Sequence, residues 1–494
     1  MTGFKLGFLG PRKACTSPNL KSCSDFPQLV SQKIQNELSA GRIEGPFDFP
    51  PFDNLHVSPI GLVPKKSPGQ YRLIHHLSYP KGDSINDFID PTLATVVYSS
   101  FDEAVDLLLN LGPGTLFSKT DIDSAFRLIP IHPSDYHLLG FKFQEKIYFD
   151  KCLPMGASSS CAIFERFSTA LHYASEQFLG IKHMVHILDD FLFLGPADSP
   201  ICQTNLQKFL DFCSLIGVPI KSEKTENATP IITFMGLELD SLTMEARLPH
   251  DKLLKLRELL MKTSKSRKVT LKELQSLLGL LNFCCQVVTP GRSFLRRLTD
   301  LTKKVTNPNH HITLNKESRK DLHAWRLFAD HFNGKSLLHK RRWLTSDTLH
   351  LHTDASGSIG FGAIFKHHWF SGTWSENLLP FDITFKELFP IVLAIEIWGH
   401  ELQEKCIILH TDNAAVVHII NRQTCKIPHI MHLVRRLVLA SMKCNILLNA
   451  EHIPGKFNIL PDLLSRSQIE KFQASAPQMD KVPTAIPDHL LLLN

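Results

Sequence analysis

Hydrophobic and polar residues recur with two different periods along the chain, and these periods predict its elements. An amphipathic stretch at 26–42 predicts a helix. The proline-rich stretch at 45–52 predicts an extended connector, because proline fixes φ and lacks an amide donor. Apolar runs flank a Lys-Lys-Ser-Pro-Gly turn and predict a β-hairpin over 58–74. Helix-like and strand-like segments then alternate to about residue 240.

The second half of the chain has two contrasting patterns. Residues 249–305 carry leucines at helical spacing among Lys and Arg, which predicts helices throughout. A stretch at 306–345, rich in Asn, His and Lys, is interpreted as a linker. From Leu349 the pattern is strand, glycine-rich turn, strand, strand, helix, strand, helix, helix, strand, helix, an order that indicates an α/β layer. We expect the tail after about residue 467 to be poorly ordered.

Composition supports a globular, multidomain protein. The chain has 494 residues and 43% apolar content, which suits two to four domains. All five tryptophans lie after residue 320 and all six tyrosines before residue 174, which indicates domains of different character. No apolar run reaches the length of a membrane span, and the N-terminus lacks a signal-peptide pattern. With 11 scattered cysteines and no C-x-x-C pair, we expect an intracellular protein of the cytoplasm or nucleus with reduced thiols.

The net charge of +6 is unevenly distributed. Residues 241–345 hold 22 Lys and Arg against 8 Asp and Glu, a local excess of 14, so the rest of the chain sums to −8. A basic region of this length between acidic flanks indicates contact with a polyanion such as a nucleic acid. A solvated helical face is the alternative interpretation.

A first set of carboxylates lies in the N-terminal half. Asp121 ends a short predicted strand, and Asp189 and Asp190 lie between two apolar runs, at the tip of a predicted hairpin. An acidic pair between buried strands is costly unless something neutralises it. Two divalent metal ions would do so, and they also suit nucleotidyl transfer to a 3′-hydroxyl. Taken alone, the pair is also compatible with a solvated β-turn.

A second set of four acids follows after residue 349. Two end predicted strands and two lie on predicted helices, so they can converge on one pair of metal ions that activates a water for hydrolysis. The four are Asp354, Glu387, Asp412 and Asp462.

Five segments in order resemble the motifs of reverse transcriptases: 63–74 (VPKKSPGQYRLI), 121–126 (DIDSAF), 153–156 (LPMG), 188–190 (LDD) and 234–236 (FMG). Three segments resemble DIRS-type retrotransposons more than Ty3-like ones: 72–80 (RLIHHLSYP), 223–226 (EKTE) and 289–292 (TPGR). The second acid set resembles ribonuclease H in order, with His452 ten residues before Asp462. The resemblance covers roughly residues 30–466.

The resemblance implies an α+β and α/β multidomain fold, a right-hand polymerase followed by a ribonuclease H-like α/β domain. The implied divisions are an N-terminal extension (1–45), fingers and palm (46–240), a helical thumb (241–305), a connection (306–345), the ribonuclease H-like domain (346–466) and a C-terminal tail (467–494).

The resemblance also implies roles for single residues. Lys65 or Lys66, with Arg72, would hold the triphosphate of a dNTP, and Lys224 would be the general acid near the leaving pyrophosphate. Phe126 would reject ribonucleotides by a clash at the sugar, although an isolated Phe is more often a core residue. Gly156 would allow close approach of the backbone, and His452 would assist product release. Ile187 and Met155 depart from the Tyr and Gln of many retroviral relatives, so both would tune nucleotide contacts and fidelity.

The implied function is RNA-directed DNA synthesis with degradation of the RNA strand of the hybrid. The cofactors would be Mg2+ or Mn2+, two ions per active site, and the partners an RNA template, a DNA primer, the RNA–DNA hybrid and dNTPs, without a membrane. The basic stretch 249–305 would grip phosphates of the primer-template. Two alternatives stay open: a decayed or domesticated relic that only binds nucleic acid, and a polymerase of another class, such as a pararetrovirus-like one. All seven acids are present, which argues against decay.

Overall fold

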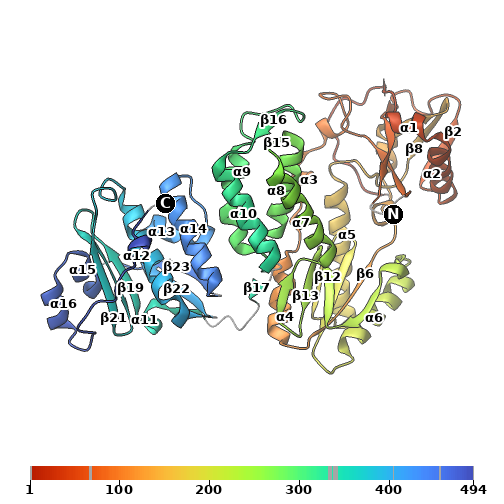
Figure 1. Ribbon diagram of the computed structural model, residues 1–494. Helices are drawn as coiled ribbons and strands as arrows, with labels where there is room; N and C mark the ends of the chain where they lie inside the picture. Colours follow the sequence, from red (N-terminus) through yellow and green to blue (C-terminus); the bar gives the residue numbers. More distant parts are fainter. Residues whose placement is uncertain are drawn as a thin grey trace. The chain divides into compact units, whose positions relative to one another are not determined.

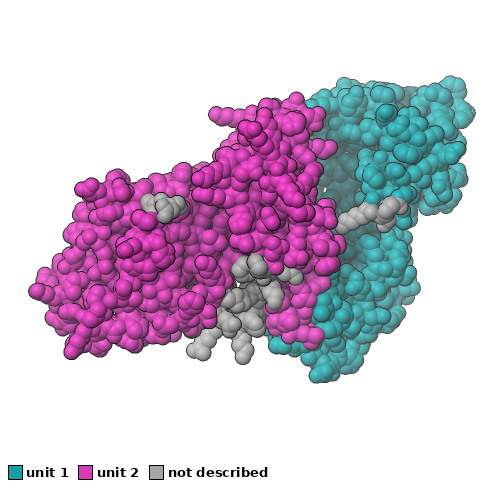
Figure 2. Space-filling model, in the orientation of Figure 1, with its two compact units in different colours: residues 1–234 teal, residues 235–494 magenta. Residues whose placement is uncertain are grey.

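The computed structural model describes residues 3–65, 69–331, 336–337, 343–403, 405–444, 446–454 and 458–492. Lys66, one of the predicted triphosphate ligands, lies outside these residues. The chain divides into two compact units, residues 1–234 and 235–494, which Figure 2 colours separately. The elements of each unit are labelled in Figure 1.

The N-terminal part of the first unit is built on a five-stranded sheet. Its strand order is β1-β3-β7-β8-β2, and the predicted hairpin forms beside it as the pair β4 and β5. The predicted helix at 26–42 is present as α2, which buries Val30 and Ile34 in a core shared with this sheet. The elements are β1 (Cys15–Thr16), α1 (Lys21–Asp25), α2 (Pro27–Ser39), β2 (Ile43–Phe47), β3 (His56–Val57), β4 (Ile60–Pro64), β5 (Tyr71–His75), β7 (Gly140–Phe143) and β8 (Lys146–Asp150).

A second, four-stranded sheet of the first unit carries the first acid set. Its order is β11-β6-β10-β9, and α5 and α6 contact it. Phenylalanines from the strands and helices meet in one core, where Phe164, Phe191 and Phe209 are fully buried. The elements are α3 (Pro91–Ala94), α4 (Phe101–Leu111), β6 (Leu116–Asp121), α5 (Ser160–Leu179), β9 (Met184–Ile187), β10 (Asp190–Gly195), α6 (Ile201–Leu215), β11 (Glu226–Thr229) and β12 (Ile231–Phe234), with short 3-10 helices η1 (Asn86–Phe88), η2 (Ala125–Leu128), η3 (Pro133–Leu138) and η4 (Ser222–Lys224).

The second unit begins with a largely helical region that corrects two expectations. Residues 249–305 are not helical throughout, because a short strand, β15, lies between α7 and α8. It pairs with β16, which follows α9. The stretch interpreted as a linker contains a long helix, α10, which packs on α7 and buries Trp325. The elements are β13 (Leu237–Asp240), β14 (Glu245–Arg247), α7 (His250–Lys265), β15 (Lys268–Thr270), α8 (Leu271–Cys284), η5 (Thr289–Phe294), α9 (Arg296–Asp300), β16 (His311–Thr313), α10 (Lys316–His331) and β17 (Ser336–Leu337).

The C-terminal region confirms the order of elements that the sequence predicts from residue 349. Antiparallel strands β19-β20-β21 form one sheet, parallel strands β18-β22-β23 form another, and β19 contacts β22. Helix α12 packs on β19 and β20, with α14 on its other side. The elements are β18 (Trp343–Thr345), α11 (Ser346–Leu349), β19 (Leu351–Ala355), β20 (Gly360–Phe365), β21 (His368–Thr373), α12 (Ile383–Trp398), η6 (Gly399–Leu402), β22 (Cys406–Thr411), α13 (Ala414–Arg422), α14 (Pro428–Lys443), β23 (Leu447–His452), α15 (Ile459–Ser465), α16 (Ile469–Ser475) and η8 (Asp488–Leu490).

The tail after residue 467 is ordered up to residue 492, contrary to expectation. Helix α16 buries Phe472 against Trp369 of β21, with ring centroids 5.1 Å apart. Disorder was expected because chain termini are often poorly ordered, but apolar contacts and hydrogen bonds to the β20–β21 hairpin anchor the tail. No disulfide joins any of the 11 cysteines, all of which lie among the described residues. Among the described helices, none combines the length and the apolar character that crossing a bilayer requires.

Candidate active sites

The three acids of the first set meet at one end of the β6-β10-β9 sheet. Asp121 is the last residue of β6 and lies directly opposite Asp190, the first residue of β10. Asp189 occupies the turn between β9 and β10, as the sequence predicts. Strands β9 and β10 and the turn between them are called the acidic hairpin below. Lys224, from the 3-10 helix after α6, forms an ion pair with Oδ2 of Asp121.

Burial and mutual repulsion oppose ionisation of this acid set. Burial, followed by the charges of Asp189 and Asp121, raises the pKa of Asp190 to about 6. Burial and the charge of Asp121 also raise the pKa of Asp189. Carboxylates held this close need cations to ionise together. Lys224 supplies one positive charge for three acids, so the site retains an excess of negative charge.

The turn of the acidic hairpin is held from behind by α5. Leu188 has a positive φ of 50°, and its amide donates to Oε2 of Glu165 across 2.8 Å. Glu165 is buried, and this burial raises its pKa although the Leu188 amide partly counters it. The hydrogen bond gives the Leu188 amide an acceptor on α5, so the position of the neighbouring Asp189 depends on Glu165.

Two histidines extend this contact into the core. His186 of β9 lies with Nε2 3.5 Å from Oε1 of Glu165, and its Nδ1 lies 2.7 Å from Nδ1 of His172 on α5. Burial and then the neighbouring His172 lower the pKa of His186 to about 4, so this ring is neutral near pH 7. With one Nδ1 donating to the other, the pair forms a polar core beside the acidic hairpin.

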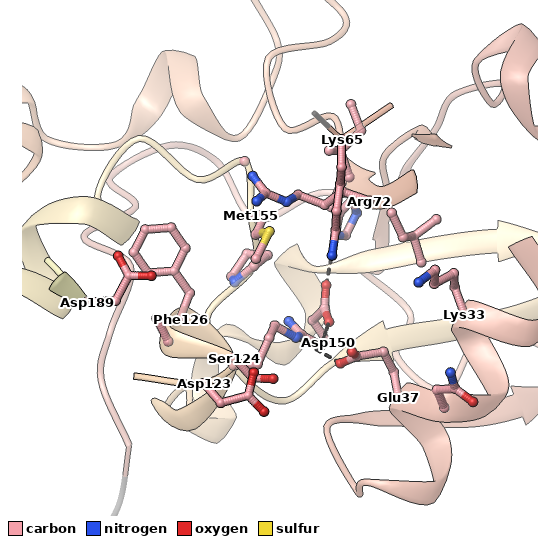
Figure 3. Close-up of a pocket in the computed structure, with 18 of the residues that line it drawn as sticks. Lys33, Glu37, Lys65, Arg72, Asp123, Ser124, Phe126, Asp150, Met155 and Asp189 are labelled. Carbon is pink, nitrogen blue, oxygen red and sulfur yellow. Dashed lines mark hydrogen bonds and ion pairs between the residues drawn. The ribbon is translucent and has the colours of Figure 1, made fainter. Parts of the chain in front are cut away.

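A cavity of about 640 Å³ opens beside the first acid set and contains most of the residues that were predicted to bind a dNTP (Figure 3). Lys65 and Arg72 come from the β4–β5 hairpin, and Met155 and Gly156 from the loop before α5. Phe126 lies beside Asp189 in the close-up. The cavity is also lined by Asp121, Asp189 and Lys224. The structure therefore brings these predicted residues together. Asp190 does not line the cavity but pairs with Asp121, which does.

Phe126 and Gly156 each have a structural role in addition to a place in this cavity. The Phe126 ring packs edge-on against Phe164, with centroids 5.4 Å apart, so it belongs both to the core and to the cavity wall. Gly156 has a φ of 153°, and a Cβ at this position would lie 2.0 Å from the carbonyl oxygen of His75. The glycine is required for close contact with β5.

The floor of the cavity is a buried ion network that the sequence did not reveal. Arg127 donates to Oδ1 of Asp150 at 2.6 Å and to Oε2 of Glu37 at 2.9 Å. His75 lies 3.0 Å from Oδ2 of Asp150. Burial alone would raise the pKa of Asp150, but Arg127 and His75 together lower it, so Asp150 stays ionised. Glu37 comes from α2, which also contributes Lys33 and Asn36 to the cavity wall.

The four acids of the second set come from four elements of the C-terminal region. Asp354 lies on β19, Glu387 on the second turn of α12, Asp412 just after β22 and Asp462 on α15. Burial, followed by the charges of Asp354 and Asp412, raises the pKa of Glu387 to about 9. Burial also raises the pKa of Asp354, with contributions from Asp462 and Asp412. These charge interactions act only over short distances, so the four predicted acids lie together in one site.

Two polar residues that the sequence did not single out orient Asp354. Ser465 on α15 donates to Oδ2 of Asp354 at 2.6 Å, and Asn458 donates to Oδ1 at 3.2 Å. Asn458 directly precedes α15 and Ser465 ends it, so both lie close in sequence to the predicted Asp462. A search of this helix and its N-cap for hydroxyl and amide groups would have found them. His452 has Nε2 3.0 Å from the backbone oxygen of Asp412, at the rim of the second set.

The donor sets of both sites fit divalent metal ions. Each site combines at least three carboxylates, and in each the pKa of one acid is raised by burial and then by the charges of its neighbours. Oxygen ligands are those that Mg2+ and Mn2+ prefer. Asp121, Asp189 and Asp190 would hold the ions of the first site, and Asp354, Glu387, Asp412 and Asp462 those of the second.

Two family models match separate parts of the chain. Residues 63–239 match the family model described as reverse transcriptase (RNA-dependent DNA polymerase), and residues 345–438 match that of an RNase H-like domain found in reverse transcriptase. The chain carries a reverse transcriptase domain followed by a ribonuclease H-like domain. The match to the reverse transcriptase domain contains the whole first acid set, and the match to the ribonuclease H-like domain contains Asp354, Glu387 and Asp412.

Relatives of this reverse transcriptase and ribonuclease H-like pair occur in viruses and transposons. A polyprotein of Cassava vein mosaic virus is 25% identical over 476 residues, which cover 91% of this chain and 66% of the viral protein. The Tf2-3 transposon polyprotein of Schizosaccharomyces pombe (strain 972 / ATCC 24843) is 25% identical over 436 residues, or 83% of this chain and 29% of that polyprotein. The chain thus spans less than two thirds of either relative.

Solved structures of foamy viral protease-reverse transcriptase share the fold. The complex with dsDNA superposes with a TM-score of 0.54 and 18% identity over 92% of this chain and 88% of that one. The complex with an RNA/DNA hybrid gives a TM-score of 0.53 over 98% of this chain and 58% of that one. This likeness supports the predicted order of a polymerase followed by a ribonuclease H-like domain.

Proposed function

We propose that this chain is an active RNA-directed DNA polymerase with a ribonuclease H, which copies the RNA of a retroelement into DNA and degrades the copied RNA. One observation carries the proposal: Asp121 and Asp189 line a cavity of about 640 Å³ together with Lys65 and Arg72, and Asp190 pairs with Asp121 beside it. Acids on one side and cations on the other match the needs of a bound triphosphate.

In the polymerase site, each side chain has a distinct task. Two Mg2+ (or Mn2+) ions, when bound, activate the primer 3′-hydroxyl and neutralise charge at the α-phosphate. Lys65 and Arg72 bind the β- and γ-phosphates of the dNTP. When bound cations neutralise the acids, the ion pair between Lys224 and Asp121 breaks. The Nζ of Lys224 then donates a proton to the leaving pyrophosphate. Phe126 contacts the sugar and excludes a 2′-hydroxyl.

In the ribonuclease H site, the acids act on the RNA strand of an RNA–DNA hybrid. Bound Mg2+ (or Mn2+) ions activate a water for attack on the phosphodiester. Ser465 and Asn458 fix both oxygens of Asp354, which pre-organises the site. His452, at the rim beside Asp412, assists release of the product.

The substrates we propose are an RNA template, a DNA primer, their hybrid and dNTPs. Two features support this choice: the foamy viral relatives of the same fold were solved with dsDNA and with an RNA/DNA hybrid, and residues 241–345 hold a net charge of +14. We further propose a DIRS-type retrotransposon as the source, from the segments 72–80, 223–226 and 289–292. Cysteines that form no disulfide among the described residues favour the cytoplasm or nucleus.

The test is a pair of reciprocal variants assayed for both activities. Asp189→Asn with Asp190→Asn should abolish primer extension on an RNA template with dNTPs and Mg2+, yet retain cleavage of a preformed hybrid. Asp354→Asn with Asp412→Asn should do the reverse. If the intact chain binds the hybrid but neither extends nor cleaves it, the proposal is wrong and the chain is a nucleic-acid-binding relic.

A pararetrovirus-like polymerase is the second candidate, favoured by the match of 91% of this chain to the cassava virus polyprotein. Both candidates share the chemistry above. They differ in the other proteins that accompany the chain, so the genomic sequence that flanks its gene would separate them: a tyrosine recombinase gene supports the retrotransposon, and viral movement or capsid genes support the virus.

A further inference from the structure

A third group of metal-binding side chains lies at the hairpin between β20 and β21, away from either acid set in the chain. Phe365 pairs with His368, so Lys366 and His367 form a two-residue turn. Asp480, from the segment that follows α16, lies against this turn. One ligand atom from each of His367, His368 and Asp480 lies within 4.8 Å of the other two.

Backbone contacts on both sides hold the three side chains in register. The amide of Asp480 donates to the carbonyl oxygen of His367 at 2.9 Å, and the Trp369 indole donates to the carbonyl oxygen of Asp480 at 2.7 Å. The amide of Thr484 donates to the carbonyl oxygen of Trp369 at 2.7 Å. Asp480 is therefore fixed to the hairpin by main-chain bonds that do not depend on its carboxylate, which leaves that carboxylate available as a ligand.

The two imidazole rings face the same side of the turn. Their centroids are 4.1 Å apart, and Nδ1 of His368 already lies 2.6 Å from Oδ2 of Asp480. All three side chains are at least partly exposed, so an ion can reach them from solvent. The charge nearby is balanced: Lys366 is paired with Glu401 across 2.8 Å, and that carboxylate also interacts with the charges of both histidines.

We propose that His367, His368 and Asp480 form a binding site for a divalent transition-metal ion of the Zn2+ class. Two imidazoles and one carboxylate are a donor set that suits Zn2+, whereas Mg2+ prefers oxygen ligands alone. Ligand atoms of a tetrahedral ion lie about 3.4 Å apart. The ligand atoms of His368 and Asp480, 2.6 Å apart without the ion, would separate slightly, and the exposed His367 side chain would rotate to close the set. Water would complete the coordination. The bound ion would clamp the C-terminal segment to the hairpin.

The experiment measures Zn2+ bound to the full chain by calorimetry, in excess Mg2+ so that the acid sets are occupied. We expect the wild-type chain to bind one more equivalent of Zn2+ than His368→Ala or Asp480→Asn. His418→Ala, which removes an exposed histidine on α13, is the matched control and should bind as the wild type does. An equal number of equivalents in all four proteins overturns the proposal.

A second readout tests the clamp without reference to enzyme activity. Lys481 is exposed and adjoins Asp480, so trypsin reaches it when the C-terminal segment opens. Zn2+ should slow cleavage after Lys481 roughly 10-fold or more in the wild type, because a ligand of the closed form suppresses opening. The rate should not change in His367→Ala with His368→Ala. Equal protection by Zn2+ in this double variant would show that the ion binds elsewhere.

Discussion

The amide of Leu188 at the tip of the acidic hairpin donates a hydrogen bond to Glu165 on α5, across 2.8 Å. This contact joins the turn that carries Asp189 to a helix of the core, and Glu165 itself lies beside His186. Because Leu188 holds a positive φ, the turn relies on outside support for its conformation. Glu165 is thus a positioning residue for the acids rather than one that touches substrate.

Glu165→Leu should lower kcat for DNA synthesis about 10- to 100-fold, because the Leu188 amide loses its acceptor and Asp189 loses its fixed position. KM for dNTP should change little. Glu165→Gln should retain most activity, since an amide oxygen also accepts a hydrogen bond. Steady-state primer extension measures both constants. Gln177→Leu, an exposed change on the same helix, is the control, and a wild-type kcat in Glu165→Leu would refute the positioning role.

Asp190 should make the metal-free protein less stable as pH rises. Its pKa is raised to about 6, above its value in the unfolded chain, so folding favours the protonated acid. The associated stability is complete below about pH 4 and is lost as pH rises through 6, by about 1–2 kcal/mol after allowance for solvent screening.

Urea denaturation in EDTA at pH 5 and pH 8, on the wild type and Asp190→Asn, measures this effect. The variant should lose less stability between the two pH values, and Mg2+ should restore the wild type at pH 8. Parallel pH dependence in the two proteins would contradict the assigned shift.

Glu387 should release a proton when the ribonuclease H-like site binds metal. Its pKa is raised to about 9, so it is protonated at pH 7.5, whereas a metal ligand must be ionised. Mg2+ titration by calorimetry in two buffers of different ionisation enthalpy should detect about one proton more in the wild type than in Glu387→Gln. Glu376→Gln, at an exposed position, should behave as the wild type does. Equal release from wild type and Glu387→Gln would exclude this role.

Phe126→Ala should admit ribonucleotides, because the ring lines the cavity and excludes a 2′-hydroxyl by its volume. The ratio of rNTP to dNTP incorporation should rise roughly 10-fold or more. The change also removes a contact with Phe164 and should cost about 1–3 kcal/mol of stability.

Phe167→Ala provides the matched control, since Phe167 packs on the same Phe164 ring with centroids 5.7 Å apart but does not line the cavity. It should lose similar stability without altering sugar selection. Similar rNTP incorporation by both variants would assign the effect to lost packing instead.

The sequence predicted those features that depend on local pattern. Apolar runs on either side of Asp189 predicted a hairpin with acids at its tip, and strand-like and helical periods after Leu349 predicted the order of the ribonuclease H-like domain. Both succeed because continuous apolar runs are typical of strands buried on both faces, and helical periods of amphipathic helices. The helix α10 was missed because its polar, histidine-rich composition resembles a linker, whereas its one buried face includes Trp325.

Contacts between segments far apart in the chain could not be predicted from the sequence. Arg127 meets Glu37 from 90 positions away, and Asp480 meets His368 from 112 positions away. Nothing in either local pattern names the partner, because charged residues on amphipathic helices and in loops usually face solvent. Ser465 and Asn458 were missed for a different reason: their role follows from the orientation of Asp354, which a motif does not contain.

The contribution of Glu37 to the buried network has a consequence for how this polymerase can be divided. The part that matches the reverse transcriptase family begins at residue 63. Arg127, however, pairs with Glu37 of α2 as well as with Asp150. Strand β2, which also precedes residue 63, pairs with β8 at the edge of the sheet. A protein trimmed to the matched part would retain every residue predicted for the polymerase site and lose the cavity wall that α2 contributes. The segment that the family model matches is therefore shorter than the segment that has to fold as one body. Sequence changes before residue 63 can damage the site as much as changes within the matched segment.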